Sequence, residues 1–301
     1  MVTSLEGGPG GAPGPAAVAT TAPDGATGPR LRRTKRPVAA ILGATWLILV
    51  VLAAVFAEAL PLPKPEALSN SFAAMPSADH LLGTDALGRD VLSRIVFGAQ
   101  VSMAVAVGAT SLSLIVGVTI GMLSGFFRGS TDAGLSIFVN FMLSFPPLIF
   151  LIAVVTALQP GLLTLVVALA LLGIPNFARV ARANTIALAD REFVTAARAL
   201  GASPVRILLR ELLSNVMLPV LSLALVVMAT LVVAEGTLSF LGLGIPPPAP
   251  SWGGMLAAGR EALRTEPQLV LVPAFFFFFT VLAFNTLGDW ARSRVGRGSS
   301  I

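Results

Sequence analysis

The chain has 301 residues, of which 55% are hydrophobic and 12% are charged, and its formal net charge is +5. Soluble globular domains carry about 25% charged residues, so this composition excludes an ordinary soluble domain and indicates an integral membrane protein. The basic residues fall in short gaps between apolar runs, a placement that is set by membrane orientation. We therefore expect the chain to lie in a lipid bilayer and to have no nucleic-acid partner. Because the chain contains no cysteine, disulfides and thiolate metal sites are excluded.

The N-terminal region combines a polar tail with a first apolar run. Residues 1–29 are rich in Gly, Pro, Ala and Thr without apolar periodicity, which predicts disorder. A basic cluster follows, and then an apolar run from Val38 to Leu60. This run is too long and begins too late for a signal peptide, and it lacks a clear cleavage site. We therefore expect a disordered cytoplasmic tail with a basic end at 1–37 and the first transmembrane helix at 38–60.

Residues 61–97 form a polar segment that we expect on the extracytoplasmic side. Thr84 is predicted to cap a short helix in which Asp90 and Arg94, four residues apart, form an ion pair. An amphipathic lid on the membrane and a docking surface both remain open for this segment. His80 is the only histidine, and one imidazole without cysteine does not make a structural zinc site, so we expect no metal site.

Five further apolar segments follow, each near the roughly 20 residues that cross about 30 Å of hydrocarbon. They lie at about 99–125, 134–158, 161–178, 216–241 and 269–289. The chain is thus predicted to have six transmembrane helices. Most lysines and arginines then fall on the side of the two termini, which places both termini in the cytoplasm. We expect a five-helix core at 98–291 and a cytoplasmic tail at 292–301.

A basic segment at 179–215, between the fourth and fifth predicted helices, is placed in the cytoplasm by the same rule. Asp190 is predicted to cap a short helix, and Gly201 to end it. Ser203 and Pro204 are predicted to begin a second helix, as its N-cap and first helical residue. The segment therefore predicts a helix–turn–helix outside the membrane.

Helix breakers and polar residues mark several positions inside the predicted spans. Pro146 and Pro147 lie near the middle of the third helix and are expected to kink it, as a hinge or as a packing feature. Asn140, about 10 Å deep, has to face protein or water. We favour a helix–helix hydrogen bond over a substrate contact for Asn140. Glu235 is expected close to the outer interface, about 28 Å along its helix.

Several motifs and residues that the sequence lacks argue against particular functions. A phosphate-binding G-x-x-x-x-G-K-[ST] loop needs a lysine followed by Ser or Thr, and neither Lys35 nor Lys64 is. An intramembrane serine protease would need a histidine within the membrane, which His80 in the outer segment does not supply. Ion-coupled carriers usually hold titratable groups at the middle of the membrane, and none falls there in the six predicted spans. Energy for transport would therefore come from a partner.

Several stretches resemble one family. FVTAARALGASPVRILLRELLSN at 193–215 is similar to the cytoplasmic "EAA" loop of ABC-importer permeases. Four others are similar to the dipeptide/oligopeptide branch, of the DppC/OppC type. They are HLLGTDALGRDVLSRIVFGAQVS at 80–102, SGFFRGSTD at 124–132, EGTLSFLGLGIPPPAPSWGGML at 235–256 and FNTLGDWAR at 284–292.

The resemblance implies the type I ABC-importer fold, an all-α integral membrane protein of six transmembrane helices with a cytoplasmic coupling-helix loop. It implies a bacterial plasma-membrane permease for di- or oligopeptides that works with a second, similar permease, two ATPase subunits and an extracytoplasmic peptide-binding protein. The chain itself would bind no cofactor and carry no catalytic residue, because ATP and Mg are held by the ATPase subunits.

The resemblance also assigns candidate site residues. Those that match the coupling helix, which docks in a cleft on the ATPase, are Phe193, Ala196, Ala197, Arg198, Leu200, Gly201, Ala202, Ser203 and Arg206. The residues noted above inside the predicted spans, and not the resemblance, supply the candidates for a translocation path or gate, which are Asn140, Pro146, Pro147 and Glu235.

The chain departs from the family pattern at two places, and the sequence leaves alternative functions open. Residues 211–215 read ELLSN where relatives commonly have HILPN, and relatives often carry Arg and Asp where this chain has Ile137 and Asn140. A cargo of nickel or another small solute is the alternative within the class. From other classes, the alternatives are a secondary transporter and a non-transporting membrane scaffold.

Overall fold

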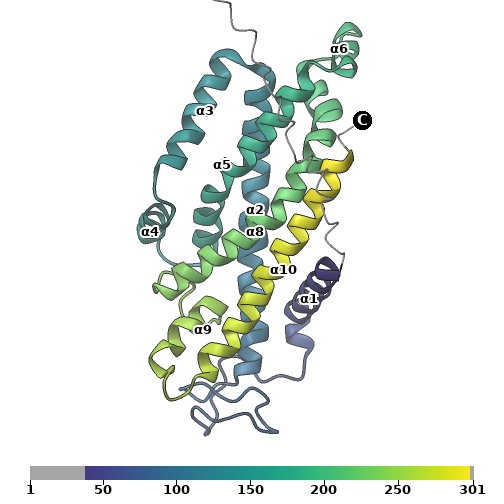
Figure 1. The fold of residues 1–301 in the computed structure, drawn as a ribbon. Helices are drawn as coiled ribbons and strands as arrows, with labels where there is room; N and C mark the ends of the chain where they lie inside the picture. The colour runs from purple at the N-terminus through teal and green to yellow at the C-terminus, as the bar shows by residue number, and fades with distance from the viewer. Residues whose placement is uncertain (1–37, 299–301) are drawn as a thin grey trace, which may run out of the picture. The chain divides into compact units, whose positions relative to one another are not determined.

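The computed structural model describes residues 38–298, so the predicted tail at 1–37 and the last three residues lie outside the described part. Within residues 38–298 every regular element is a helix, and one isolated antiparallel bridge joins Thr84 to Asp90. The prediction of an all-α protein is therefore confirmed for this part of the chain (Figure 1).

Five helices in the described part are long and apolar enough to cross a membrane. They are α1 (Val38–Val55), α2 (Val91–Phe127), α5 (Leu162–Ala189), α8 (Leu213–Phe240) with the turns before it, and α10 (Gln268–Gly298). The first is shorter than predicted, because α1 ends at Val55 and a 3₁₀ turn, Ala57–Ala59, follows it. A sixth span exists if α3 and α4, described next, are counted together.

The third predicted span is broken rather than kinked. Its first half is α3 (Gly129–Ser144), its second half is α4 (Pro147–Leu158), and the two axes differ by 92°. Proline disfavours helical geometry in the residue before it, and Phe145 is accordingly extended, with ψ at 137°. Pro146 is followed directly by Pro147 at the first position of α4, so the second helix begins at once in a new direction.

The remaining helices are short. α6 (Glu192–Ala199) lies between α5 and α7 (Pro204–Arg206), and α9 (Trp252–Gly259), followed by a 3₁₀ turn, lies between α8 and α10. A π-helical stretch, Ile207–Leu212, joins α7 to α8 without interruption, so one helix runs from Pro204 to Phe240. The predicted second helix of the cytoplasmic segment is therefore not separate, because it continues directly into the next span.

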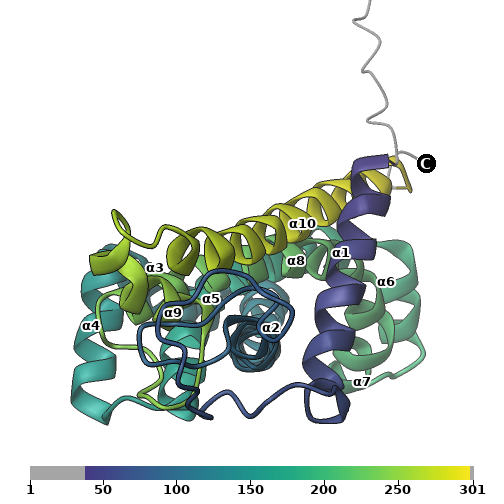
Figure 2. The ribbon, with the colours of Figure 1, turned by 90° about the horizontal axis from the view of Figure 1, so that it is seen from below.

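Two hydrophobic clusters hold the helices together, and α2 and α8 contribute to both. The first lies among α2, α4, α5, α6 and α8 and includes Val194 of α6. The second lies among α1, α2, α8, α9 and α10 and includes Trp252, whose indole N–H donates to the carbonyl of Ile95 at 3.0 Å. Figure 2 shows α2 end-on, with α10 running across beside it and α3 and α4 on the side away from α1.

α2 and α5 approach closely along three glycines of α2. Gly117, Gly121 and Gly125 are spaced four residues apart, which places them on one face. A Cβ atom would lie 2.7 Å from the carbonyl oxygen of Ile174 at Gly117 and 2.8 Å from that of Arg182 at Gly125, and at Gly121 it would overlap the backbone of α5. Small residues at this spacing let two helix backbones meet in a membrane.

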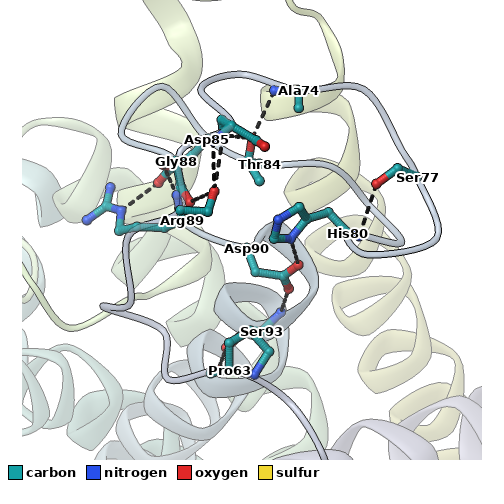
Figure 3. Close-up of polar contacts among 12 residues, drawn as sticks. Pro63, Ala74, Ser77, His80, Thr84, Asp85, Gly88, Arg89, Asp90 and Ser93 are labelled. Atoms are coloured by element: carbon teal, nitrogen blue, oxygen red, sulfur yellow. Dashed lines mark hydrogen bonds and ion pairs between the residues drawn. The ribbon is translucent and has the colours of Figure 1, made fainter.

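The segment between α1 and α2 is a loop held by its own hydrogen bonds (Figure 3). The Thr84 hydroxyl donates to the carbonyl of Ser71 and accepts from the amide of Ala74 at 2.8 Å. Thr84 is fully buried under the loop that makes these contacts. The prediction that it caps a helix is therefore wrong, since its hydroxyl fixes a distant part of the same loop.

Asp90 is the residue that begins α2. One carboxylate oxygen of Asp90 accepts from the amide of Ser93 at 2.7 Å, and the other lies 2.9 Å from Nδ1 of His80 (Figure 3). The predicted ion pair between Asp90 and Arg94 is wrong, because these contacts occupy the Asp90 carboxylate. Arg94 lies instead beside Asp85, with 3.6 Å between Nε and Oδ2.

Substituting Gly121 tests the close packing of α2 on α5. We expect Gly121→Val to destabilise the protein by about 1–3 kcal/mol, because the new side chain has to push the two helices apart. Gly134→Val is the matched control, since no atom lies within 4 Å of a Cβ at Gly134. Thermal unfolding in detergent measures both, and equal midpoints for Gly121→Val and the unsubstituted protein would contradict the packing.

Candidate coupling site

The predicted coupling residues lie at one end of the helices, next to the junction of α2 and α3. The loop between α1 and α2 lies at the opposite end (Figure 1). The two segments that were expected on opposite sides of the membrane are therefore at opposite ends of the spanning helices.

α6 begins without a side-chain cap. Arg191 is its N-cap residue, in an extended conformation, and no side chain accepts from the first turn. The predicted cap by Asp190 is wrong, because that carboxylate accepts instead from Nη2 of Arg128 at 2.7 Å. This ion pair joins the end of α5 to the residue between α2 and α3.

The end of α6 follows the prediction. Gly201 has a φ of +78°, the left-handed conformation that glycine adopts without strain. Its amide donates to the carbonyl of Arg198 at 2.9 Å, and the amide of Ala202 donates to that of Ala197 at 3.0 Å. This pair of bonds is a Schellman motif, which satisfies the last carbonyls of the helix. Gly201 therefore ends α6, as expected from the sequence.

The start of the next helix is also confirmed. Ser203 is extended, and its hydroxyl oxygen accepts from the amide of Arg206 at 3.4 Å. Pro204 occupies the first helical position, where its missing N–H leaves no bond unmade. Only Gly201 and Ala202 therefore separate the C-cap of α6, Leu200, from this N-cap.

Most of the predicted coupling residues are exposed. Val194 is fully buried, and Ala197 and Ala202 are partly buried against the first hydrophobic cluster. Leu200 is 89% exposed. The other exposed members of the predicted set are Phe193, Ala196, Arg198, Gly201, Ser203 and Arg206.

Sequence reasoning missed two exposed apolar residues in this region. Val205 and Leu209 are 62% and 60% exposed, and they lie four residues apart at the start of the helix that leads into α8. Their apolar character just before a predicted span, at helical spacing, is the signal that could have found them.

Further contacts attach α6 and α5 to their neighbours. The guanidinium of Arg198 lies over the ring of Phe126, with 5.3 Å to the ring centroid, which joins α6 to the end of α2. Asp132 in the first turn of α3 accepts from Nε and Nη2 of Arg182 in α5 at 2.6 and 2.7 Å. Ser124 of α2 also donates to Asp132. One carboxylate therefore connects α2, α3 and α5.

This carboxylate is the principal anchor of α3. Val139 is the one buried residue of α3. The stretch SGFFRGSTD was recognised in the sequence, but nothing in it indicated Arg182, which lies 50 residues after Asp132. The bidentate geometry is the strong form of an arginine–carboxylate pair.

The residues proposed for a path or gate lie in two places. Asn140 is exposed on α3, and its side-chain amide makes no hydrogen bond to any residue from 38 to 298. The favoured helix–helix bond is therefore not formed within this part of the chain. Pro146 and Pro147 are exposed at the break between α3 and α4.

Glu235 is buried, with 1% of its surface exposed. Its carboxylate accepts from the hydroxyl of Ser239 at 2.8 Å and lies 3.5 Å from that of Ser102 on α2. Ser239 in turn lies 3.5 Å from Ser251, which caps α9. Glu235 therefore links α2, α8 and α9 through hydroxyl groups, near the end of α8 that is distant from α6.

Known proteins with similar sequences identify the family. Residues 117–300 match the family described as "Binding-protein-dependent transport system inner membrane component". The chain is 35% identical over 269 residues to the dipeptide transport system permease protein DppC of Alkalihalophilus pseudofirmus, covering 87% of this chain and 86% of the relative. It is 36% identical over 267 residues to the glutathione transport system permease protein GsiD of Escherichia coli O157:H7, covering 87% of each.

A solved structure shows the same fold. The MetNI methionine ABC transporter, described in inward facing conformations, includes a chain that superposes with a TM-score of 0.55. The sequence identity is 21%, and the match covers 67% of this chain and 96% of that chain. The chain therefore belongs to the family of binding-protein-dependent transport system inner membrane components, as a multi-pass permease subunit of an ABC importer.

Proposed function

We propose that this permease subunit serves an ATP-driven importer of di- or oligopeptides. One observation supports a peptide as the cargo. The two relatives named above, which match 87% of this chain, are named for the transport of a dipeptide and of glutathione, and both are short peptides. Neither of these two relatives is named for nickel or another small solute, which is the alternative cargo within the class. A second permease would complete the path, and a peptide-binding protein would deliver the cargo.

The proposed ATPase contact is the exposed surface of α6 and the turns after it. Apolar side chains that are exposed outside a membrane span mark a protein interface. Leu200 is the strongest case, because 89% of it is exposed and it contributes to neither hydrophobic cluster. Two ATPase subunits would bind ATP and Mg, and this chain would supply one docking surface and no catalytic group.

Movement of α6 would pass to the membrane through the contacts already described. The Arg198–Phe126 contact and the Arg128–Asp190 ion pair tie α6 and the end of α5 to α2, and glycine packing ties α2 to α5. Asp132 then ties the start of α3 to the same pair. We infer that these elements move together.

The break between α3 and α4 would let α4, the second half of the span, stay in place while α3 moves. Pro146 and Pro147 supply this hinge in our proposal, since two helices that meet at 92° share no continuous backbone hydrogen bonding. Asn140 lies on the exposed face of α3 and needs a polar neighbour. We infer that Asn140 faces the path or the second permease. We also infer that Glu235, which is buried, would take part in gating through the hydroxyl groups that link it to α2 and α9, those of Ser102 and Ser251.

The proposed topology follows from these roles. The end that carries α6 is cytoplasmic, with both termini on that side, and residues 61–90 are extracytoplasmic. The division into a tail at 1–37, a first helix at 38–60, an outer segment at 61–97, a core at 98–291 and a tail at 292–301 stays a proposal. Within it, α2 already begins at Val91.

Leu200→Asp tests the docking surface. We expect it to leave membrane insertion and assembly of the second permease intact, because Leu200 packs against nothing in either cluster. Peptide uptake should fall about tenfold or more, since a charge would be buried in an apolar contact. Uptake and ATP hydrolysis by proteoliposomes measure this, and Leu200→Met is the conservative control. Normal uptake by Leu200→Asp would count against the docking site.

Charge reversal at Asp132 and Arg182 tests the anchor of α3. We expect Asp132→Arg and Arg182→Asp each to lower the number of peptides imported per ATP hydrolysed, by roughly fivefold or more, because α3 no longer follows α5. The double exchange should restore most of the ratio, since the ion pair re-forms with opposite polarity. A double variant no better than either single variant would show that the pair does not transmit movement.

A further inference from the structure

A cavity of about 210 Å³ is lined by residues around the start of α2. This end of the helices lies opposite α6 (Figure 1). The walls of the cavity come from residues 85–94 at the outer end of α2 and from α9, the 3₁₀ turn after it and the start of α10. Most of the lining is apolar, with Val91, Met255 and Leu269 as its largest buried members. Three charged residues, Asp85, Arg89 and Arg94, also line it.

Asp85 is fully engaged by its own loop. One carboxylate oxygen accepts from the amides of Leu87 and Arg89 at 2.9 and 3.0 Å, and the other accepts from Nε of Arg89 at 2.7 Å. Figure 3 shows the Asp85 and Arg89 side chains turned toward each other. Asp85 and Arg89 therefore neutralise each other, and the remaining formal charge on the cavity wall is the positive charge of Arg94.

Arg94 is buried, and Asp85 lies at ion-pair rather than hydrogen-bond distance from it. The Arg94 side chain is 9% exposed, Nη1 donates to the carbonyl of Pro65 at 3.1 Å, and Nε lies 3.6 Å from Asp85, beyond hydrogen-bond distance. A guanidinium has five N–H donors, so most of its donors lack an acceptor among residues 38–298. Asp85 and Glu66 act on Arg94 through their charge and accept no hydrogen bond from it. A carboxylate in the cavity would therefore accept from the N–H groups of Arg94 that have no acceptor.

We propose that this cavity binds a carboxylate attached to a small apolar body. Arg94 would take the carboxylate, for which its planar guanidinium is the best-matched side chain. Val91, Met255 and Leu269 would surround the apolar part. The volume is below the roughly 300–1,000 Å³ of pockets for drug-sized ligands, so the occupant has about the size of one amino-acid residue.

The C-terminal residue of a peptide has this chemistry, with its carboxylate beside one apolar side chain. We therefore assign the cavity as an entry subsite for the C-terminal residue of the cargo, an assignment that rests on the proposed peptide import. A medium-chain fatty acid from the membrane carries the same two groups and is distinguished below.

The test is a binding titration on the importer assembled in lipid nanodiscs without the binding protein. The probes are the dipeptide Ala-Leu, its C-terminal amide, and octanoate, and calorimetry measures each dissociation constant. We expect Ala-Leu to bind and its amide to bind about tenfold or more weakly, because the amide has lost the charge that Arg94 recognises.

Two variants locate the site. Arg94→Gln removes the charge, and Ala258→Phe fills the cavity without removing a side-chain hydrogen bond of the loop. Each should weaken Ala-Leu binding about tenfold or more. Arg264→Gln is the matched control, since Arg264 is an exposed arginine at the same end that does not line the cavity, and it should bind as the unsubstituted importer does.

Several results would overturn this inference. They are no binding of Ala-Leu, equal binding of Ala-Leu and its amide, and unchanged binding in both cavity variants. Binding of octanoate alone, lost in Arg94→Gln, would overturn the peptide assignment in favour of a fatty acid. Uptake of Ala-Leu into proteoliposomes is measured in parallel. Import without binding at the cavity overturns only this inference, whereas no import by the unsubstituted importer overturns the proposed function.

Discussion

Close backbone contact between α2 and α5 is the constraint on which the rest of the structure depends. Gly117, Gly121 and Gly125 allow it, because any side chain at these positions would meet the backbone or side chains of α5. α2 also contributes to both hydrophobic clusters, so it connects the α1 and α10 side of the protein to the α5 and α8 side. α5 leads directly into α6, so this helix pair joins the proposed coupling site to the spanning helices.

Exposed apolar side chains have different neighbours inside and outside the membrane-spanning helices. Along α1 and α10 they lie on helices that are long enough to cross a membrane, where lipid is the natural neighbour. At Phe193 on α6 and at Leu200 just after it, they lie outside every helix that is long enough to cross a membrane, and a protein surface is the natural neighbour there. Charged groups gather at the two ends of the helices, with Asp132–Arg182 at one end and Asp85–Arg89 at the other. Each group fixes a loop or helix end to its neighbours.

Local signals predicted the local features well. Hydropathy indicated the spans, and Gly201, Ser203 and Pro204 placed the end of α6 and the start of the next helix, because these effects act within one helical turn. The errors came from partners distant in sequence. Asp190 lies beside a capping position, but Arg128, 62 residues away, takes its carboxylate. Thr84 precedes a helix, but a loop packs over it. No local pattern indicated that Asp132 would meet Arg182 or that Arg94 would line a cavity.

We propose that the end of α6 presents Leu200 to a nucleotide-hydrolysing subunit in the cytoplasm. Because the chain has no cysteine, Leu200→Cys introduces a single thiol, which can be labelled and cross-linked in the assembled importer. We predict that an impermeant thiol reagent reaches it only from the cytoplasmic side, and that a short cross-linker joins it to the ATPase subunit. Labelling from outside intact cells, or an assembled importer that forms no cross-link to the ATPase, would contradict the account.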